Sequence, residues 1–117
     1  RNPRKRFPPL RESPLFSVTG QITAAQVPEI AQAGFKSIIC NRPDSEDGAV
    51  PHDAVETAAR EAGLEFRFLP VVSGAITAEN VQEMAATLEN LPQPVLAYCR
   101  SGGRCLNLYA LVQETKD

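Results

Sequence analysis

The fold is decided by the stretch Pro94-Val95-Leu96-Ala97-Tyr98-Cys99-Arg100-Ser101-Gly102-Gly103-Arg104-Cys105. Its first part has no polar residue before Tyr98, which predicts a short strand buried on both faces at the centre of a parallel sheet. Residues 106–113 are apolar enough to form the helix that follows. In such sheets ligands bind beyond the carboxyl ends of central strands, so we expect the chemistry in the loop after Tyr98.

The rest of the chain alternates predicted strands with predicted helices. Strands are expected at 15–18, 35–40 and 64–71, and helices at 24–33, 53–62 and about 77–89. Thr23 and Gln26 have the spacing of a capping box at the start of the first helix. The alternation predicts an α/β fold, a sandwich in which a central, mainly parallel sheet of about four to five strands is flanked by helices.

The composition is that of one soluble domain. The chain has 117 residues, of which 43% are hydrophobic and 22% charged, and four of its twelve basic residues lie in the first six positions. We therefore expect a basic tail at residues 1–9 and a single acidic domain at residues 10–117, which disfavours nucleic acid as a partner. No apolar run approaches the roughly 18 residues of a membrane span. The three cysteines lack metal-ligand spacing, so no metal or other cofactor is expected, and their odd, sparse number favours a reducing, cytoplasmic compartment.

The loop after the central strand carries a candidate nucleophile, Cys99. It precedes a helix N-terminus, where aligned peptide dipoles, free backbone N–H groups and the Arg104 guanidinium favour an anion. Its pKa should therefore be depressed and its sulfur held as the reactive thiolate. Gly102 and Gly103 allow the loop to curl into an anion-binding nest. The predicted catalytic residues are Cys99 and Arg104, and the predicted anion-binding residues are Arg100, Ser101, Gly102, Gly103, Cys105 and Arg42.

Several motifs resemble known families. Residues 98–104 resemble the active-site loop of rhodanese sulfurtransferases and the phosphate-binding loop of cysteine-dependent phosphatases. More of the chain, about 10–113, resembles the bacterial phosphatase-like domain family of beta-lactamase-hydrolase-like proteins, through motifs at 17–22, 33–39, 41–44, 69–71 and 74–77. The resemblance implies a dual-specificity-phosphatase-like fold, phosphatase or sulfur-transfer activity, and fusion to or action alongside sulfide-oxidation enzymes.

Two features favour sulfur transfer over phosphate hydrolysis. Four residues separate the cysteine from the arginine of the loop, whereas phosphatase families place five there, and a shorter loop suits a single persulfide sulfur. The loop at 72–76 also lacks the aspartate that phosphatases of this fold use as general acid, although Asp44, Glu46 or Asp47 of a neighbouring loop can take that place. The first expectation is therefore a rhodanese-type sulfurtransferase that carries sulfane sulfur as a Cys99 persulfide.

Two other functions stay open. One is a tyrosine- or dual-specificity-type phosphatase that forms phosphocysteine, with Arg104 on the phosphate. The other is a non-catalytic anion-binding or redox-sensing module, in which Cys99 pairs with Cys40 or Cys105 as a resolving thiol. Cys105 also replaces the Ser or Thr usual in the family, and because a thiol is the weaker donor we expect a less stabilised thiolate. Arg42 is expected to add positive potential or hold the substrate, a small anion such as thiosulfate, a persulfide or a phosphate ester.

Overall fold

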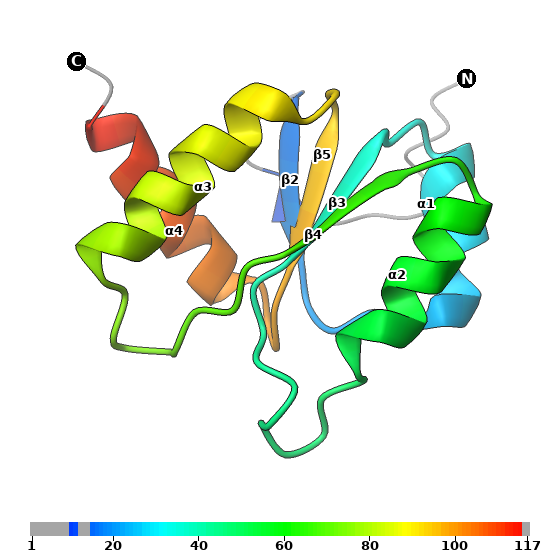
Figure 1. The fold of residues 1–117 in the computed structure, drawn as a ribbon, viewed down its shortest axis with the longest axis horizontal. Coiled ribbons are helices and arrows are strands. Elements are labelled where there is room, and N and C mark those ends of the chain that lie inside the picture. The colour runs from blue at the N-terminus through cyan, green and yellow to red at the C-terminus, as the bar shows by residue number, and fades with distance from the viewer. Residues whose placement is uncertain (1–9, 12–14, 116–117) are drawn as a thin grey trace.

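A computed structural model of the chain describes residues 10–11 and 15–115, and the predicted basic tail lies outside them. Its centre is a five-stranded sheet with the order β1-β2-β5-β3-β4 (Figure 1). The strands are β1 (Leu10–Arg11), β2 (Phe16–Thr19), β3 (Ser37–Cys40), β4 (Glu65–Phe68) and β5 (Val95–Tyr98). Only β1, which was not predicted, pairs antiparallel; the other pairs are parallel. The predicted α/β sandwich with β5 at its centre is confirmed.

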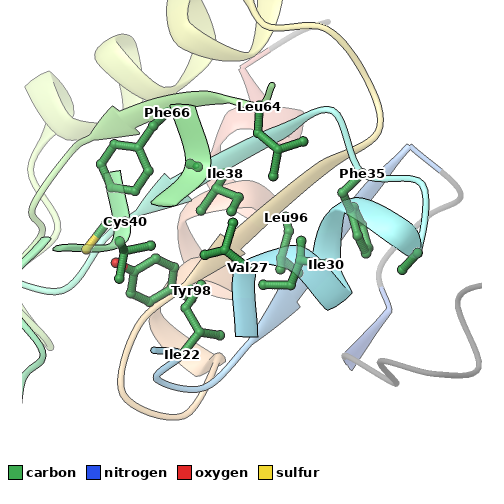
Figure 2. Packing of buried hydrophobic residues seen from close by; sticks show 13 residues of the cluster. Ile22, Val27, Ile30, Phe35, Ile38, Cys40, Leu64, Phe66, Leu96 and Tyr98 are labelled. Carbon is green, nitrogen blue, oxygen red and sulfur yellow. The ribbon is translucent and has the colours of Figure 1, made fainter. Parts of the chain in front are cut away.

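Helices cover both faces of the sheet (Figure 1). One face carries η2 (Ala24–Gln26), α1 (Val27–Gln32) and α2 (His52–Glu61), and the other carries α3 (Ala78–Asn90) and α4 (Gly103–Glu114). Because side chains alternate along a strand, neighbouring residues of β3 and β5 enter different hydrophobic clusters. Ile38 and Tyr98 belong to the cluster under α1 and α2, shown in Figure 2, whereas Ile39 and Ala97 belong to the cluster under α3 and α4.

The region predicted as one helix at 24–33 consists of two pieces, the short 3-10 turn η2 and then α1. Proline has no N–H and is tolerated in the first turn of an α-helix, and Pro28 stands at that place in α1. The Oε1 atom of Gln26 accepts a hydrogen bond from the Thr23 backbone N–H at 2.9 Å, as a capping box requires.

Two further element boundaries differ from the prediction. The strand predicted at 64–71 is shorter, since β4 ends at Phe68 and the chain then follows the loop after β3, with the N–H of Val71 bonded to the carbonyl of Asn41 at 2.9 Å. The last helix is longer, because α4 begins at Gly103 rather than near residue 106. Gly102 precedes it with φ at 95°, a backbone conformation that favours glycine. The early start places Arg104 and Cys105 in the first turn of α4.

The arrangement brings three loops to one edge of the sheet. The segments that follow β3, β4 and β5 all leave the carboxyl ends of parallel strands there (Figure 1). Ligands of such sheets bind beyond the carboxyl ends of the strands, so we expect the binding site at this loop edge.

Among the described residues, no helix is long and apolar enough to cross a membrane.

Candidate active site

A cleft of about 610 Å³ lies at this loop edge. Its lining comes from the loops after β3, β4 and β5 and from the start of α4. The lining residues are Arg42, Glu46, Asp47, Ser73, Cys99, Arg100, Ser101 and Arg104. The fold thus brings Arg42, from the 41–44 motif, close to residues 98–105, which we call the cysteine loop. The two segments are more than fifty positions apart in the sequence.

Cys99 lies at the bottom of the cysteine loop, with its sulfur surrounded by hydrogen-bond donors. The backbone N–H of Gly102 donates to Sγ at 3.1 Å, and the N–H groups of Ser101 and Cys105 also donate to it. The hydrogen bond from the Cys105 side chain is the largest influence on the Cys99 pKa; with the backbone donors it outweighs the opposing effect of burial and lowers that pKa to about 5. Cys99 is therefore a thiolate at neutral pH, the nucleophilic form of cysteine.

Cys105, where the family usually has Ser or Thr, lies beside the nucleophile and acts on its pKa. Its side chain is fully buried in the first turn of α4. Burial, followed by the hydrogen bond to Cys99 and the charge on that sulfur, raises the Cys105 pKa well above its ordinary value. The thiol therefore stays protonated and donates to Cys99.

Arg104 is held by an ion pair and still offers one unused donor. Its Nη1 and Nη2 atoms donate to the two carboxylate oxygens of Glu46 at 2.9 and 3.2 Å, and Nη1 also donates to the Val71 carbonyl at 2.9 Å. The side chain is 7% exposed, and Nε has no hydrogen-bond partner among the described residues. A buried N–H without a partner is costly, which makes Nε a candidate donor to an anion in the cleft that Arg104 lines.

Arg42 supports the site from the loop after β3. Its side chain is 5% exposed, and Nε donates to Glu46 Oε1 at 3.0 Å. Nη1 donates to Gln21 Oε1 at 2.9 Å, and Nη2 donates to the carbonyl of Asp47 at 2.6 Å. Arg42 adds positive charge to the cleft. Its Nε, Nη1 and Nη2 atoms all donate to protein acceptors, and these hydrogen bonds hold Glu46 and the loop after β3 in place.

The three carboxylates proposed as stand-in acids have different surroundings. Asp44 accepts from the backbone N–H of His52 at 2.9 Å and contacts its Nδ1 at 2.7 Å; burial opposes these hydrogen bonds, but they lower its pKa. The hydrogen bond from Arg104 lowers the pKa of Glu46. Asp47 lines the cleft, and its carboxylate has no hydrogen bond or ion pair within the described part of the chain.

Cys40 pairs with Tyr98, the residue before Cys99, but its side chain lies on the other face of the sheet from Cys99. Its side chain belongs to the cluster under α1 and α2, beside the Tyr98 ring (Figure 2), whereas Cys99 and Cys105 belong to the cluster on the other face. Its thiol donates to the carbonyl of Arg42 at 3.4 Å, and burial raises its pKa. The sheet therefore separates Cys40 from the two cysteines of the loop.

The sequence analysis did not predict the contacts between the cysteine loop and the residues that follow β2. The backbone N–H of Gln21 donates to the Arg100 carbonyl at 3.3 Å, and a Cβ at Gly20 would lie 2.9 Å from that same oxygen. Ser73, from the loop after β4, also lines the cleft. No sequence spacing signals these contacts, because β2 and β5 become neighbours only in the sheet.

The fold and the site define the class of the domain. A cysteine loop between a central parallel strand and a helix, with a thiolate and an arginine in one cleft, defines an α/β domain with a site for nucleophilic chemistry on an anion. Residues 10–116 match the family model described as beta-lactamase hydrolase-like protein, phosphatase-like domain. The chain belongs to this family.

Relatives agree with this assignment. A beta-lactamase hydrolase-like protein of Xylella fastidiosa is 38% identical over 97 residues, which are 82% of this chain and 22% of that protein. The chain thus spans about a fifth of the length of the curated relatives it matches. A solved structure of a candidate phosphatase from Neisseria meningitidis has a TM-score of 0.80 and 31% identity, covering 92% of this chain and 80% of that one. A candidate phosphatase from Shewanella putrefaciens, at 23% identity, shows the same fold with a TM-score of 0.81 over 95% of this chain and 74% of that one.

These findings contradict the expected rhodanese-type sulfurtransferase. The matching family is phosphatase-like, and so is the solved relative from Neisseria meningitidis. The expected link to sulfide-oxidation enzymes finds no support in them. The short spacing between cysteine and arginine misled the prediction because it does not decide the chemistry: a loop with four intervening residues still directs its N–H groups at Cys99 and brings Arg104 to the cleft.

Proposed function

We propose that this domain is a cysteine-dependent phosphatase that hydrolyses small phosphate monoesters. The observation that carries the proposal is that one cleft is lined by the Cys99 thiolate and by Arg104, whose buried Nε–H has no partner among the described residues. A phosphate dianion needs several donors and a nucleophile on one side of the phosphorus, and the nest of N–H groups with Arg104 supplies this arrangement.

The first step of the proposed reaction is attack of the Cys99 sulfur on phosphorus. An S–P bond forms, the P–O bond to the leaving group breaks, and phosphocysteine results. Arg104 and the loop N–H groups bind the non-bridging oxygens, whose charge they stabilise in the transition state. Glu46 holds the Arg104 guanidinium in place through its two hydrogen bonds, and we assign the remaining Nε–H to an oxygen of the substrate.

The leaving oxygen needs a proton, and we assign that role to Asp47. Of the three carboxylates near the site, Asp44 is bound to His52 and Glu46 to two arginines, and both pKa values are lowered. Asp47 lines the cleft and its carboxylate is unpaired within the described residues. It gives its proton to the leaving alkoxide or phenoxide, and the resulting carboxylate takes a proton from the water that hydrolyses phosphocysteine and releases inorganic phosphate.

The experiment is hydrolysis of p-nitrophenyl phosphate by the wild-type chain and by Cys99→Ser. We expect turnover by the wild type, none above background by the variant, and a wild-type adduct heavier by one phosphoryl group on Cys99 after acid quenching. Equal rates for the two proteins, or no turnover of any aryl phosphate by folded wild type, would overturn the proposal. We also infer a reducing compartment such as the cytoplasm, because all three cysteines are free and the reaction requires reduced Cys99.

A further inference from the structure

His52, the only histidine of the chain, contacts both the loop after β3 and the end of β4 without lining the cleft. Its Nδ1 atom lies 2.7 Å from Oδ2 of Asp44, in the loop after β3. Because a carboxylate only accepts hydrogen bonds, Nδ1 carries the proton in this pair. The His52 ring stacks on that of Phe68, the last residue of β4, with 3.7 Å between the ring centroids and 2° between the planes. We call Asp44, His52 and Phe68 the clasp.

Asp44 also fixes the start of α2. The first N–H groups of a helix need acceptors, and Pro51, at the N-cap position of α2, makes no side-chain cap hydrogen bond. Oδ1 of Asp44 accepts from the backbone N–H of His52 at 2.9 Å and takes that role, and a negative charge suits the positive end of the helix dipole. Both oxygens of one carboxylate therefore tie the loop after β3 to the first residue of α2, the helix into which that loop runs in Figure 1.

The two segments that His52 joins are also the ones that hold Arg104. Glu46, in the loop after β3, accepts from Nη1 and Nη2 of Arg104 at 2.9 and 3.2 Å. Val71, in the loop after β4, accepts from Nη1 at 2.9 Å through its carbonyl. A shift of either loop moves an acceptor of Arg104, so the direction of its remaining Nε–H depends on the distance between the loops.

We propose that the clasp positions Arg104 for anion binding by holding the loops after β3 and β4 together. Its members are positioning residues, because none of them lines the cleft and they act through the acceptors of Arg104. The value of the clasp for catalysis rests on the proposed phosphatase function, whereas its effect on anion binding does not. Both parts of the His52 side chain are needed: the Nδ1–H for the carboxylate and the ring face for the aromatic stack.

The same helix offers a matched control. Oε2 of Glu56 accepts from Nε and Nη2 of Arg60 at 3.1 and 3.0 Å, further along α2. Like the pair of Asp44 and His52, this pair joins a partly exposed carboxylate to a nitrogen donor, but both of its residues belong to α2. Glu56→Gln therefore removes a similar surface interaction without changing a contact between the loops.

The test measures how inorganic phosphate protects Cys99 of the full chain from alkylation by iodoacetamide, a neutral reagent that needs no anion site. Asp44→Asn and Phe68→Ala should each weaken the affinity for phosphate by about tenfold, because a displaced guanidinium loses part of its contact with the anion. Phe68→Tyr, which keeps the stacked ring, and Glu56→Gln should match wild type. The alkylation rate without phosphate should be the same in all four variants, since the donors to the Cys99 sulfur lie in the cysteine loop.

A second measurement separates positioning from a general weakening of the fold. Because the clasp acts largely through Glu46, Asp44→Asn should weaken phosphate binding little further when Glu46→Gln is already present. A further tenfold loss in that background, the same loss in Glu56→Gln, or unchanged protection in both Asp44→Asn and Phe68→Ala would overturn the clasp.

The clasp and the phosphatase proposal can fail separately. A wild type that binds phosphate through the clasp but hydrolyses no aryl phosphate would refute the phosphatase proposal alone. An active wild type whose clasp variants bind phosphate equally well would refute the clasp alone. If phosphate does not protect wild type, the clasp is overturned, and the hydrolysis assay decides the phosphatase proposal by itself.

Discussion

Replacing Cys105 with alanine tests the origin of the Cys99 thiolate. The Cys105 side chain is the largest influence that brings the Cys99 pKa to about 5. A hydrogen bond to a charged group contributes about 1.5–3 kcal/mol, and about 1.4 kcal/mol corresponds to one pKa unit, so losing the donor should raise that pKa by about one to two units. Cys105→Ser keeps a donor in the same place, and its Cys99 pKa should stay near or below the wild-type value.

The measurement is the ultraviolet absorbance of the thiolate across pH, with Cys99→Ser subtracted as the blank. Burial raises the pKa values of Cys40 and Cys105, so neither thiol titrates in the same range. At pH 5.5 a pKa near 5 leaves about three quarters of Cys99 ionised, whereas a pKa near 6.5 leaves about one tenth. An unchanged midpoint in Cys105→Ala, with the protein folded, would refute the assignment and leave the backbone N–H groups as the source of the shift.

Three further predictions concern the cleft and the core. Glu46→Gln should loosen Arg104 and lower kcat/KM for p-nitrophenyl phosphate by about 10²-fold, while Glu56→Gln, which breaks only an exposed pair on α2, should leave it unchanged; equal effects would contradict the positioning role. Asp47→Asn should slow hydrolysis of phenyl phosphate by about 10²-fold or more and that of p-nitrophenyl phosphate far less, because a good leaving group needs no proton; a uniform loss across leaving groups would remove Asp47 as the acid. Leu108→Ala, in the fully buried cluster under α4, should lower the free energy of unfolding in urea by about 2–5 kcal/mol, and a loss below about 1 kcal/mol would show that the cluster repacks.

The cleft could be located from the sequence because its central part is local. The apolar strand, the cysteine and the paired glycines follow each other without interruption, so the nest of N–H groups is a property of one loop. The hydrogen-bond partners of Arg104 could not be predicted from the sequence, because Glu46 comes from the loop after β3 and Val71 from the loop after β4. The expectation of sulfur transfer was wrong because neither the four-residue spacing nor the lack of an aspartate at 72–76 decides the chemistry, and a carboxylate of the loop after β3, Asp47, also lines the cleft.

The α/β class, the central position of β5 and the place of the cysteine loop follow from the order of residues along the chain. Hydrophobic periodicity and turn residues act over neighbouring positions, so they can be recognised in the sequence. The charges that surround the cysteine depend instead on how the folded chain brings distant loops together. Parallel pairing of β3, β4 and β5 brings distant loops to one edge, where Glu46 accepts from Nη1 and Nη2 of Arg104 and Nε has no partner among the described residues. The first turn of α4 places Cys105 in the same cluster as Cys99, whereas Cys40 pairs with Tyr98 in the sheet and its side chain lies on the opposite face from that of Cys99, the next residue along the chain.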